Sequence, residues 1–215
     1  MSLQSIGNCQ HYWEFNSANF SSNAFQDLVG SVNPTLNTGT PTYTSFNSVE
    51  GLDLSGGTQY LEFPDTKVLG EMSVISVIGY RGGGLTYGLS TLSTTTGFNF
   101  RMQCTSNTPQ FWRSVGASNS SEVSQSSVNV HSYGVRLEDG LIWSRVDDNT
   151  EATASSVADK NDSAINTHSN WQFGRYGTTL DPMQLVFEIA VYIDDISQDP
   201  DYETEIQALL TKYGI

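Results

Sequence analysis

The segment from Met183 to Ile193 constrains the fold of this chain more than any other. Apolar side chains occupy every second position in it, at Met183, Leu185, Phe187, Ile189, Val191 and Ile193. Gln184, Glu188 and Tyr192 stand between them. This period of two predicts a long, half-buried β-strand and not a helix. A strand of this kind must pair within a sheet, so we expect a protein built largely of β-structure.

Three earlier segments predict further strands. Residues 12–16 and 59–63 alternate between apolar and polar side chains. Residues 72–80 are apolar on both faces, which is typical of a central strand covered on both sides. The turn Asp139-Gly140 separates two alternating segments, and Asp-Gly in this position predicts a β-hairpin.

The segment around residue 100 gives a test of strand register. One predicted face carries Phe98, Phe100 and Met102, and the other carries Asn99, Arg101 and Gln103. We expect the first face to be buried and the second to be exposed. Residues 110–113 are the predicted partner strand.

One helix is predicted, from about Pro200 to Tyr213. Asp199 is the expected cap, Pro200 suits the first helical position, and Gly214 suits the end. The apolar residues form a single stripe that should dock on the sheets: Tyr202, Ile206, Leu209, Leu210 and Tyr213.

Composition narrows the classes of function. The 215 residues include 9 basic and 23 acidic ones, for a net charge of -14. Duplex DNA and anionic membranes are poor partners for such a chain, because both are bound by clustered lysines and arginines. No segment reaches the length of a membrane span, and no signal peptide is visible. Abundant Ser, Thr and Asn without an export signal fit a virion protein. Cys9 and Cys104 are too few for a disulfide framework, and Cys104 is expected to be a buried free thiol.

We therefore expect an all-β fold, a two-sheet antiparallel jelly-roll sandwich with a short C-terminal helix. Residues 12–215 form its single domain, and residues 1–11 are an N-terminal segment that could act as a contact arm. Any homo-oligomer should use low-charge contacts, because the net charge opposes close packing of copies. The first ten residues and the segment 82–96 are low in charge, and the latter carries Leu85, Tyr87, Leu89 and Leu92. The alternative is that this segment covers the edge of the sandwich.

Four stretches resemble laminin-G-like jelly rolls of the concanavalin A-like lectin/glucanase superfamily, in the style of bacteriophage and bacterial proteins. The first pairs an aromatic strand at 12–16 with Asp27-Leu28-Val29-Gly30. The others are the strand pair within 51–77, the hairpin 136–149 and the final strand and helix. Asn149 departs from the glycine that is common at the end of that hairpin. The resemblance implies a scaffold that binds ligands or builds assemblies. Only some branches of the superfamily catalyse a reaction.

The carboxylate pattern of the catalytic branches is missing. Glycanases of this superfamily place two Glu and one Asp at alternate positions of one strand. Here Glu50 and Asp53 are offset by three, and Glu188 is alone on its strand. The three histidines have no Gly-x-Ser-x-Gly partner: His11, His131 and His168. We therefore expect no enzymatic activity.

Sugar binding requires exposed aromatic faces beside polar groups. Aromatic and arginine residues at predicted strand ends or in loops are the candidate glycan-binding set: Tyr80, Arg81, Tyr87, Trp112, Arg113, Arg175 and Tyr176. Trp13, Trp143 and Trp171 lie in alternating strands and are expected in the core. The neighbours of Trp112 do not decide between core and surface.

No cofactor is required, although calcium is open because many relatives bind it. Asp147, Asp148 and Asn149 are the candidate ligands, and 159–162 and Asp194-Asp195 are similar oxygen-rich clusters. Ordinary solvated turns explain all three equally, since Asp and Asn are common in turns.

The resulting hypothesis is a noncatalytic bacteriophage virion protein that binds host-surface glycan as an adhesion or receptor-binding module. The alternative is a structural decoration or fibre component that contacts other virion proteins, and a glycan hydrolase is the third candidate. No nucleic-acid partner and no membrane insertion are expected.

Overall fold

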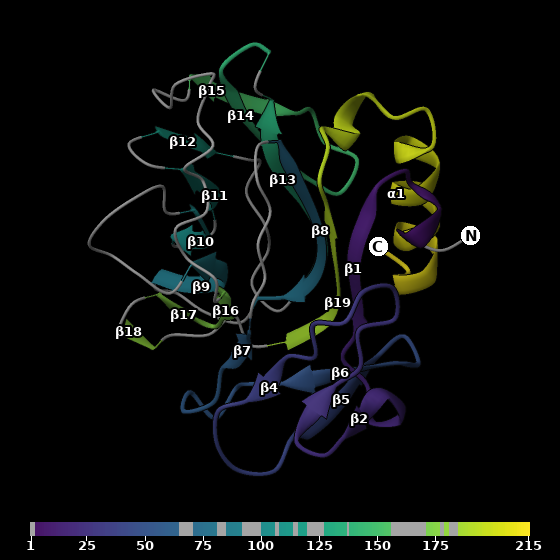
Figure 1. Ribbon diagram of the computed structural model, residues 1–215, viewed down its shortest axis with the longest axis vertical. Helices are drawn as coiled ribbons and strands as arrows, with labels where there is room; N and C mark the ends of the chain where they lie inside the picture. The colour runs from purple at the N-terminus through teal and green to yellow at the C-terminus, as the bar shows by residue number, and fades with distance from the viewer. Residues whose placement is uncertain are drawn as a thin grey trace.

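In the computed structural model, the strands form two antiparallel sheets that face each other (Figure 1). The structure describes residues 3–64, 71–80, 85–91, 100–105, 108–113, 116–119, 127–136, 138–155, 171–176, 179–180 and 185–215. A helix closes the chain on one side of the sandwich. The predicted fold class, an all-β sandwich with a short C-terminal helix, is confirmed.

Sheet A has eight strands in the order β15-β14-β13-β8-β19-β6-β5, with β1 paired to β19. Along one edge of β19, the strand pairs first with β6 and then with β1. The strand bounds are β1 Cys9–Glu14, β5 Thr42–Phe46, β6 Val49–Asp53, β8 Met72–Gly79, β13 Val128–Arg136, β14 Leu141–Val146, β15 Ala152–Ser155 and β19 Leu185–Tyr192.

Sheet B has nine strands in the order β12-β11-β10-β9-β16-β7-β4-β3-β2. Their bounds are β2 Phe20–Ser21, β3 Ala24–Phe25, β4 Thr35–Leu36, β7 Leu61–Phe63, β9 Leu85–Thr91, β10 Phe100–Thr105, β11 Thr108–Arg113, β12 Gly116–Asn119 and β16 Trp171–Phe173. A separate two-stranded ribbon and four helical segments complete the described chain: β17 Arg175–Tyr176, β18 Thr179–Leu180, the 3-10 turns Leu3–Ser5, Ser17–Asn19 and Ile196–Gln198, and α1 Tyr202–Tyr213.

Two apolar cores lie on the two faces of sheet A. The larger one fills the space between the sheets and includes Trp13 and Trp171. The second lies under α1 and includes Trp143. All three tryptophans are buried, as predicted. Sheet A is therefore covered on both sides, which explains why β8 is apolar on both faces.

Part of the N-terminal segment packs in the second core, and its role as a contact arm stays a prediction. Leu3 and Ile6 are buried there, and the hydroxyl of Tyr192 donates to the carbonyl of Leu3 at 2.8 Å. The strand β1 already begins at Cys9, within the segment expected to precede the domain. Burial of two apolar side chains stabilises this segment against the sandwich.

The half-buried character predicted for the last strand is wrong. Every residue of β19 is buried, because α1 covers the face that would otherwise be exposed (Figure 1). A register shift between Val186 and Glu188 also changes the faces. Phe187 therefore packs in the core under α1, whereas Ile189 packs between the sheets. A bulge of this kind cannot be read from a pattern of period two.

The helix begins two residues later than predicted. Asp201 takes the N-cap position, and Asp199 instead accepts a hydrogen bond from the backbone N–H of Asp201 at 2.8 Å. Gly214 ends the helix in the left-handed conformation, with φ of 64°, as expected. The predicted apolar stripe is buried. No helix in the described part of the chain is long and apolar enough to cross a membrane.

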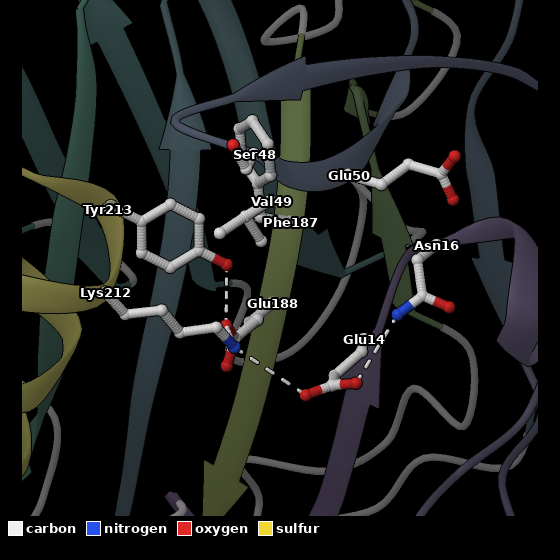
Figure 2. Close-up of a pocket in the computed structure, with 9 residues that line it drawn as sticks. All are labelled: Glu14, Asn16, Ser48, Val49, Glu50, Phe187, Glu188, Lys212 and Tyr213. Carbon is white, nitrogen blue, oxygen red and sulfur yellow. Dashed lines mark hydrogen bonds and ion pairs between the residues drawn. The ribbon is translucent and has the colours of Figure 1, made fainter.

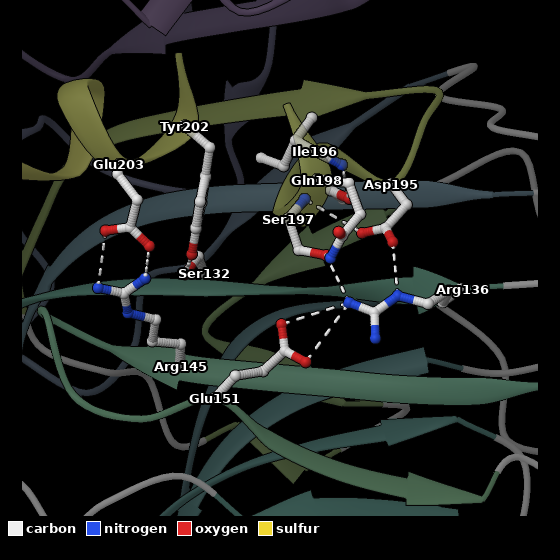
Figure 3. A network of polar contacts seen from close by, with 11 residues as sticks. Ser132, Arg136, Arg145, Glu151, Asp195, Ile196, Ser197, Gln198, Tyr202 and Glu203 are labelled. Carbon is white, nitrogen blue, oxygen red and sulfur yellow. Dashed lines mark hydrogen bonds and ion pairs between the residues drawn. The ribbon is translucent and has the colours of Figure 1, made fainter. Parts of the chain in front are cut away.

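Polar contacts hold the C-terminal region to sheet A (Figure 3). The guanidinium of Arg136 donates to Asp195 at 2.7 Å and also contacts Ser197 and Glu151. Nearby, Arg145 forms a two-pronged ion pair with Glu203 on α1. These contacts fix the position of α1 on sheet A. This position places the last residues of the helix beside β19.

The predictions for the central strands hold in part. The hairpin β13–β14 and the pairing of β10 with β11 are confirmed. Met102 is buried as expected, but Gln103, which was expected to be exposed, is buried too. Phe98 and Asn99 lie outside the described residues, as do the side chains of Phe100 and Arg101.

Residues 85–91 of the segment predicted as an oligomer contact form β9 of sheet B. Tyr87 and Leu89 are buried in β9, and Leu85 is 39% exposed. Leu92 lies outside the described residues. The two cysteines are free, with Cys104 buried as predicted.

His131 predicts an acid-sensitive contribution to stability. Burial lowers the pKa of this imidazole from 6.5 to about 4, and its Nε2 has no hydrogen-bond partner in the described structure. Between these two pH values the unfolded chain binds a proton that the folded protein does not. Stability should therefore fall by about 3 kcal/mol as the pH drops from 6.5 to 4.

The His131→Leu variant should lack this part of the pH dependence. Urea unfolding of both proteins between pH 4 and 7 measures the difference. Parallel losses of stability in the two proteins would contradict the role of His131.

Candidate functional site

A cleft of about 420 Å³ opens where four elements meet: β1, the turn between β5 and β6, β19 and the end of α1 (Figure 2). Its volume falls within the range of small-ligand sites. The cleft is lined by Glu14, Asn16, Ser48, Val49, Glu50, Phe187, Glu188, Lys212 and Tyr213.

The β5–β6 turn forms one wall of the cleft. Asn47 and Ser48 both have positive φ, of 46° and 67°, as two-residue hairpin turns require. The amide of Asn47 donates to the carbonyl of Tyr213, which ties the turn to the end of α1. Gly51 lies against the ring of Phe187, where a Cβ would come within 2.4 Å of it. The turn, helix end and strand are thereby held at fixed positions around the cleft.

Glu188 forms the buried floor of the cleft. The register of β1 and β19 places it directly opposite Glu14. Its side chain is 3% exposed and accepts hydrogen bonds from Tyr12 at 2.7 Å and Tyr213 at 2.6 Å. Lys212 forms an ion pair with the same carboxylate. Three donors therefore satisfy this buried charge.

The hydroxyl of Tyr12 lies between the carboxylates of Glu14 and Glu188. Tyr12 lies 2.9 Å from Glu14 and 2.7 Å from Glu188, and its single O–H can donate to only one at a time. Burial, followed by the negative charge of Glu188, raises the pKa values of Tyr12 and Tyr213 well above the ordinary range. Both phenols therefore stay protonated and act as donors.

The accessible rim of the cleft mixes hydrogen-bond donors and acceptors. The side chains of Glu14 and Lys212 are 31% and 41% exposed and lie 3.7 Å apart. Asn16 donates to Glu14 at 3.4 Å. Glu50 accepts from the backbone N–H of Ser17 at 2.6 Å, and hydrogen bonds from Ser17 lower its pKa. Such a rim suits a ligand with many hydroxyl groups, because each hydroxyl both donates and accepts.

This cleft was not among the sites predicted from the sequence. Glu188 is indeed the only carboxylate on its strand, but the adjacent strand supplies Glu14. A lone Glu in an otherwise apolar strand signals a buried charge that needs partners. The identity of those partners depends on tertiary pairing between residues far apart in the chain.

The predicted aromatic set does not form one exposed site in the described structure. Tyr80 is 1% exposed and packs between the sheets, and Tyr87 is 5% exposed. Neither can present an open ring face to a sugar, so the expectation that these two rings are exposed is wrong. Arg81 lies outside the described residues. For Trp112, Arg113 and Tyr176 only the backbone in β11 or β17 is described, so their roles stay predictions.

Arg175 makes a contact that the sequence did not suggest. Its guanidinium lies over the ring of Tyr60, 4.7 Å from the centroid, and donates to the hydroxyl of that residue at 2.6 Å. Tyr60 in turn donates to Glu62 at 3.1 Å. None of these three residues lines the cleft.

One of the three predicted calcium ligands, Asp147, is engaged in protein contacts. Asp147 accepts from Asn129 at 2.7 Å and from the N–H of Val130 at 2.8 Å, and burial raises its pKa. Asp148 and Asn149 are exposed turn residues. Asp194 accepts from Asn8, and Asp195 pairs with Arg136.

No group of three or more His, Cys, Asp or Glu side chains among the described residues is arranged to hold a metal ion. Residues 159–162 lie outside the described part of the chain. A calcium site therefore stays a prediction without structural support.

Comparison with known proteins shows the fold. No family model matches the chain, and no curated protein matches it. Solved structures do match, at low sequence identity. Trypanosoma rangeli sialidase in complex with sialic acid has a TM-score of 0.65 at 11% identity, over 97% of this chain and 33% of the sialidase chain. The chain therefore spans about a third of the sialidase chains that it matches.

Two further structures are similar. Domain 4 of AbnA, a GH43 extracellular arabinanase from Geobacillus stearothermophilus in complex with arabinotriose, has a TM-score of 0.64 at 12% identity, covering 86% of this chain and 93% of that domain. The binding domain of botulinum neurotoxin DC in complex with SialylT has a TM-score of 0.68 at 10% identity, covering 94% and 52%. At these identities the likenesses show the fold alone. Membership of the laminin-G-like family stays a prediction.

Proposed function

We propose that this chain is a noncatalytic glycan-binding module and that the cleft beside α1 holds the sugar. One observation carries the proposal: the cleft combines a saccharide-sized volume with exposed carboxylate, amide and ammonium groups. Sugar hydroxyls can pair with all three kinds of group. The similar structures were solved with sialic acid, arabinotriose and SialylT, which supports a carbohydrate ligand.

The arrangement of Glu14 and Glu188 argues against hydrolysis. Most glycosidases use two carboxyl groups that both reach the glycosidic bond. Glu188 is 3% exposed and is held by three protein donors, so it can neither attack a sugar nor deliver a proton to one. We propose that the cluster positions the cleft and does no chemistry.

Glycan-array binding followed by calorimetry tests this function. We expect saturable binding of at least one glycan. Glu50→Ala should weaken that binding about tenfold or more, since it removes roughly one hydrogen bond to a charged group. Glu62→Ala on sheet B removes an equivalent carboxylate away from the cleft and should leave affinity unchanged.

Three outcomes would overturn the proposal. Binding to no glycan would remove the function, and equal effects of the two variants would remove the cleft as its site. Steady release of reducing ends from a bound polysaccharide would show an enzyme.

The virion location is a separate proposal. We propose that the module is displayed on a phage particle. Its composition supports this, because it is rich in Ser, Thr and Asn and only 15% of its residues are charged. Mass spectrometry of purified particles tests this location, and absence of the chain from them would contradict it. Binding to a shell or tail protein without any glycan affinity would favour the structural decoration role.

A further inference from the structure

The charges around the cleft bear on which class of sugar it can hold. Among the residues that line it, three are glutamates and one is a lysine. Lys212 pairs with Glu188 and so compensates the buried carboxylate. Lys212 also lies 3.7 Å from Glu14, so one ammonium group faces three carboxylates, and Glu14 and Glu50 give the accessible rim an excess of negative charge.

The hydrogen bonds of the rim keep these charges in place. Glu50 is the second residue of β6 and accepts from the N–H of Ser17, which fixes its carboxylate on one side of the opening. Glu14 is fixed on the other side by Tyr12 and Asn16. Figure 2 shows the two side chains extending from different strands at the same opening. A ligand in the cleft therefore faces both rim carboxylates as well as the ammonium of Lys212.

We infer that the cleft selects sugars bearing a protonated amino group, such as glucosamine units, and disfavours sialic acid and other anionic sugars. This inference rests on the proposed glycan-binding function. An ammonium group can donate charged hydrogen bonds to the rim carboxylates, whereas a sugar carboxylate would be repelled by them. The net charge of -14 on the chain adds to the repulsion of anionic ligands.

Calorimetry with three probes tests the selectivity at mildly acidic pH and low salt. The probes are a β-1,4 glucosamine tetramer, the matched N-acetylglucosamine tetramer and sialyllactose. The glucosamine tetramer should bind about tenfold more tightly than its acetylated form, since its amino groups make charged hydrogen bonds. Sialyllactose should show no measurable binding. Added salt should reduce the preference, because the rim is exposed.

Charge-removing variants locate the effect. Glu14→Gln and Glu50→Gln keep the shape and polarity of the rim, and each should reduce the preference for the glucosamine tetramer. Glu62→Gln is the matched control, because it makes the same charge change beside Tyr60 on sheet B. The ratio of the affinities for the two tetramers should be the same for Glu62→Gln as for the unmodified protein.

The outcomes separate this inference from the proposed function. Equal binding of the two tetramers would overturn the charge selectivity while leaving a glycan site in place. Tighter binding of sialyllactose would overturn it as well. A preference that is equally reduced by Glu62→Gln would show a whole-chain charge effect and contradict the role of the rim. Failure of every glycan on the array would remove the proposed function itself.

Discussion

Asp27→Ala is expected to lower the free energy of unfolding by about 4 kcal/mol. The buried carboxylate of Asp27 accepts from four backbone N–H groups, of Tyr12, Val29, Gly30 and Val32, at 2.9–3.1 Å. It also lies 2.6 Å from Nδ1 of His11. The alanine variant leaves these groups without their acceptor at the start of β1. Urea unfolding at neutral pH measures the loss.

Asp53→Ala provides the control. Asp53, the last residue of β6, is partly exposed and accepts from one backbone N–H, that of Ser55, at 2.8 Å. Its removal should cost less than about 1 kcal/mol. If the two variants are equally stable, the Asp27 loop does not hold β1 as described.

Asp27 also makes the stability of the protein depend on pH. Burial alone would raise the pKa of Asp27, but the hydrogen bonds from His11 and the backbone outweigh it and lower the pKa. The stability from this group is present above the ordinary pKa of Asp and is lost as the pH falls below it. The alanine variant should therefore lose less stability than the unmodified protein in this acidic range.

Glu188→Ala should lower the free energy of unfolding by about 3 kcal/mol, the second largest effect. Tyr213 would lose its acceptor, Tyr12 would keep only Glu14, and the packed side chain would leave a cavity. Lys212 is 41% exposed and can return to water, which limits the cost. Glu188→Gln keeps an acceptor and the volume, so its loss should be smaller.

Glu62→Ala is the matched control for the buried carboxylate. Glu62 is partly exposed and accepts from one tyrosine hydroxyl, that of Tyr60. Its loss should stay within about 1 kcal/mol. Urea unfolding of the three variants makes the comparison, and a Glu188→Ala cost as small as that of Glu62→Ala would show that the cluster does not stabilise the fold.

Local sequence determined the elements of this protein. Alternation predicted the strands, Asp139-Gly140 predicted the hairpin, and Gly214 predicted the helix end. These features depend on backbone preferences and on side chains close in sequence. The resemblance noted at Asp27 and Gly30 also has a local reason, because a Cβ on Gly30 would come within 2.7 Å of Asp27 and 2.6 Å of His11.

Tertiary structure alone decided which faces are buried and where the cleft lies. The covering of β19 by α1 and the bulge at Val186–Glu188 depend on how distant elements pack. For the same reason Tyr80 is buried, although its position at the end of β8 predicted exposure. Glu14 and Glu188 are 174 positions apart and meet only because β1 pairs with β19. The sequence by itself determined the strands and the isolated glutamate, and only the pairing of those strands brought its partners to it.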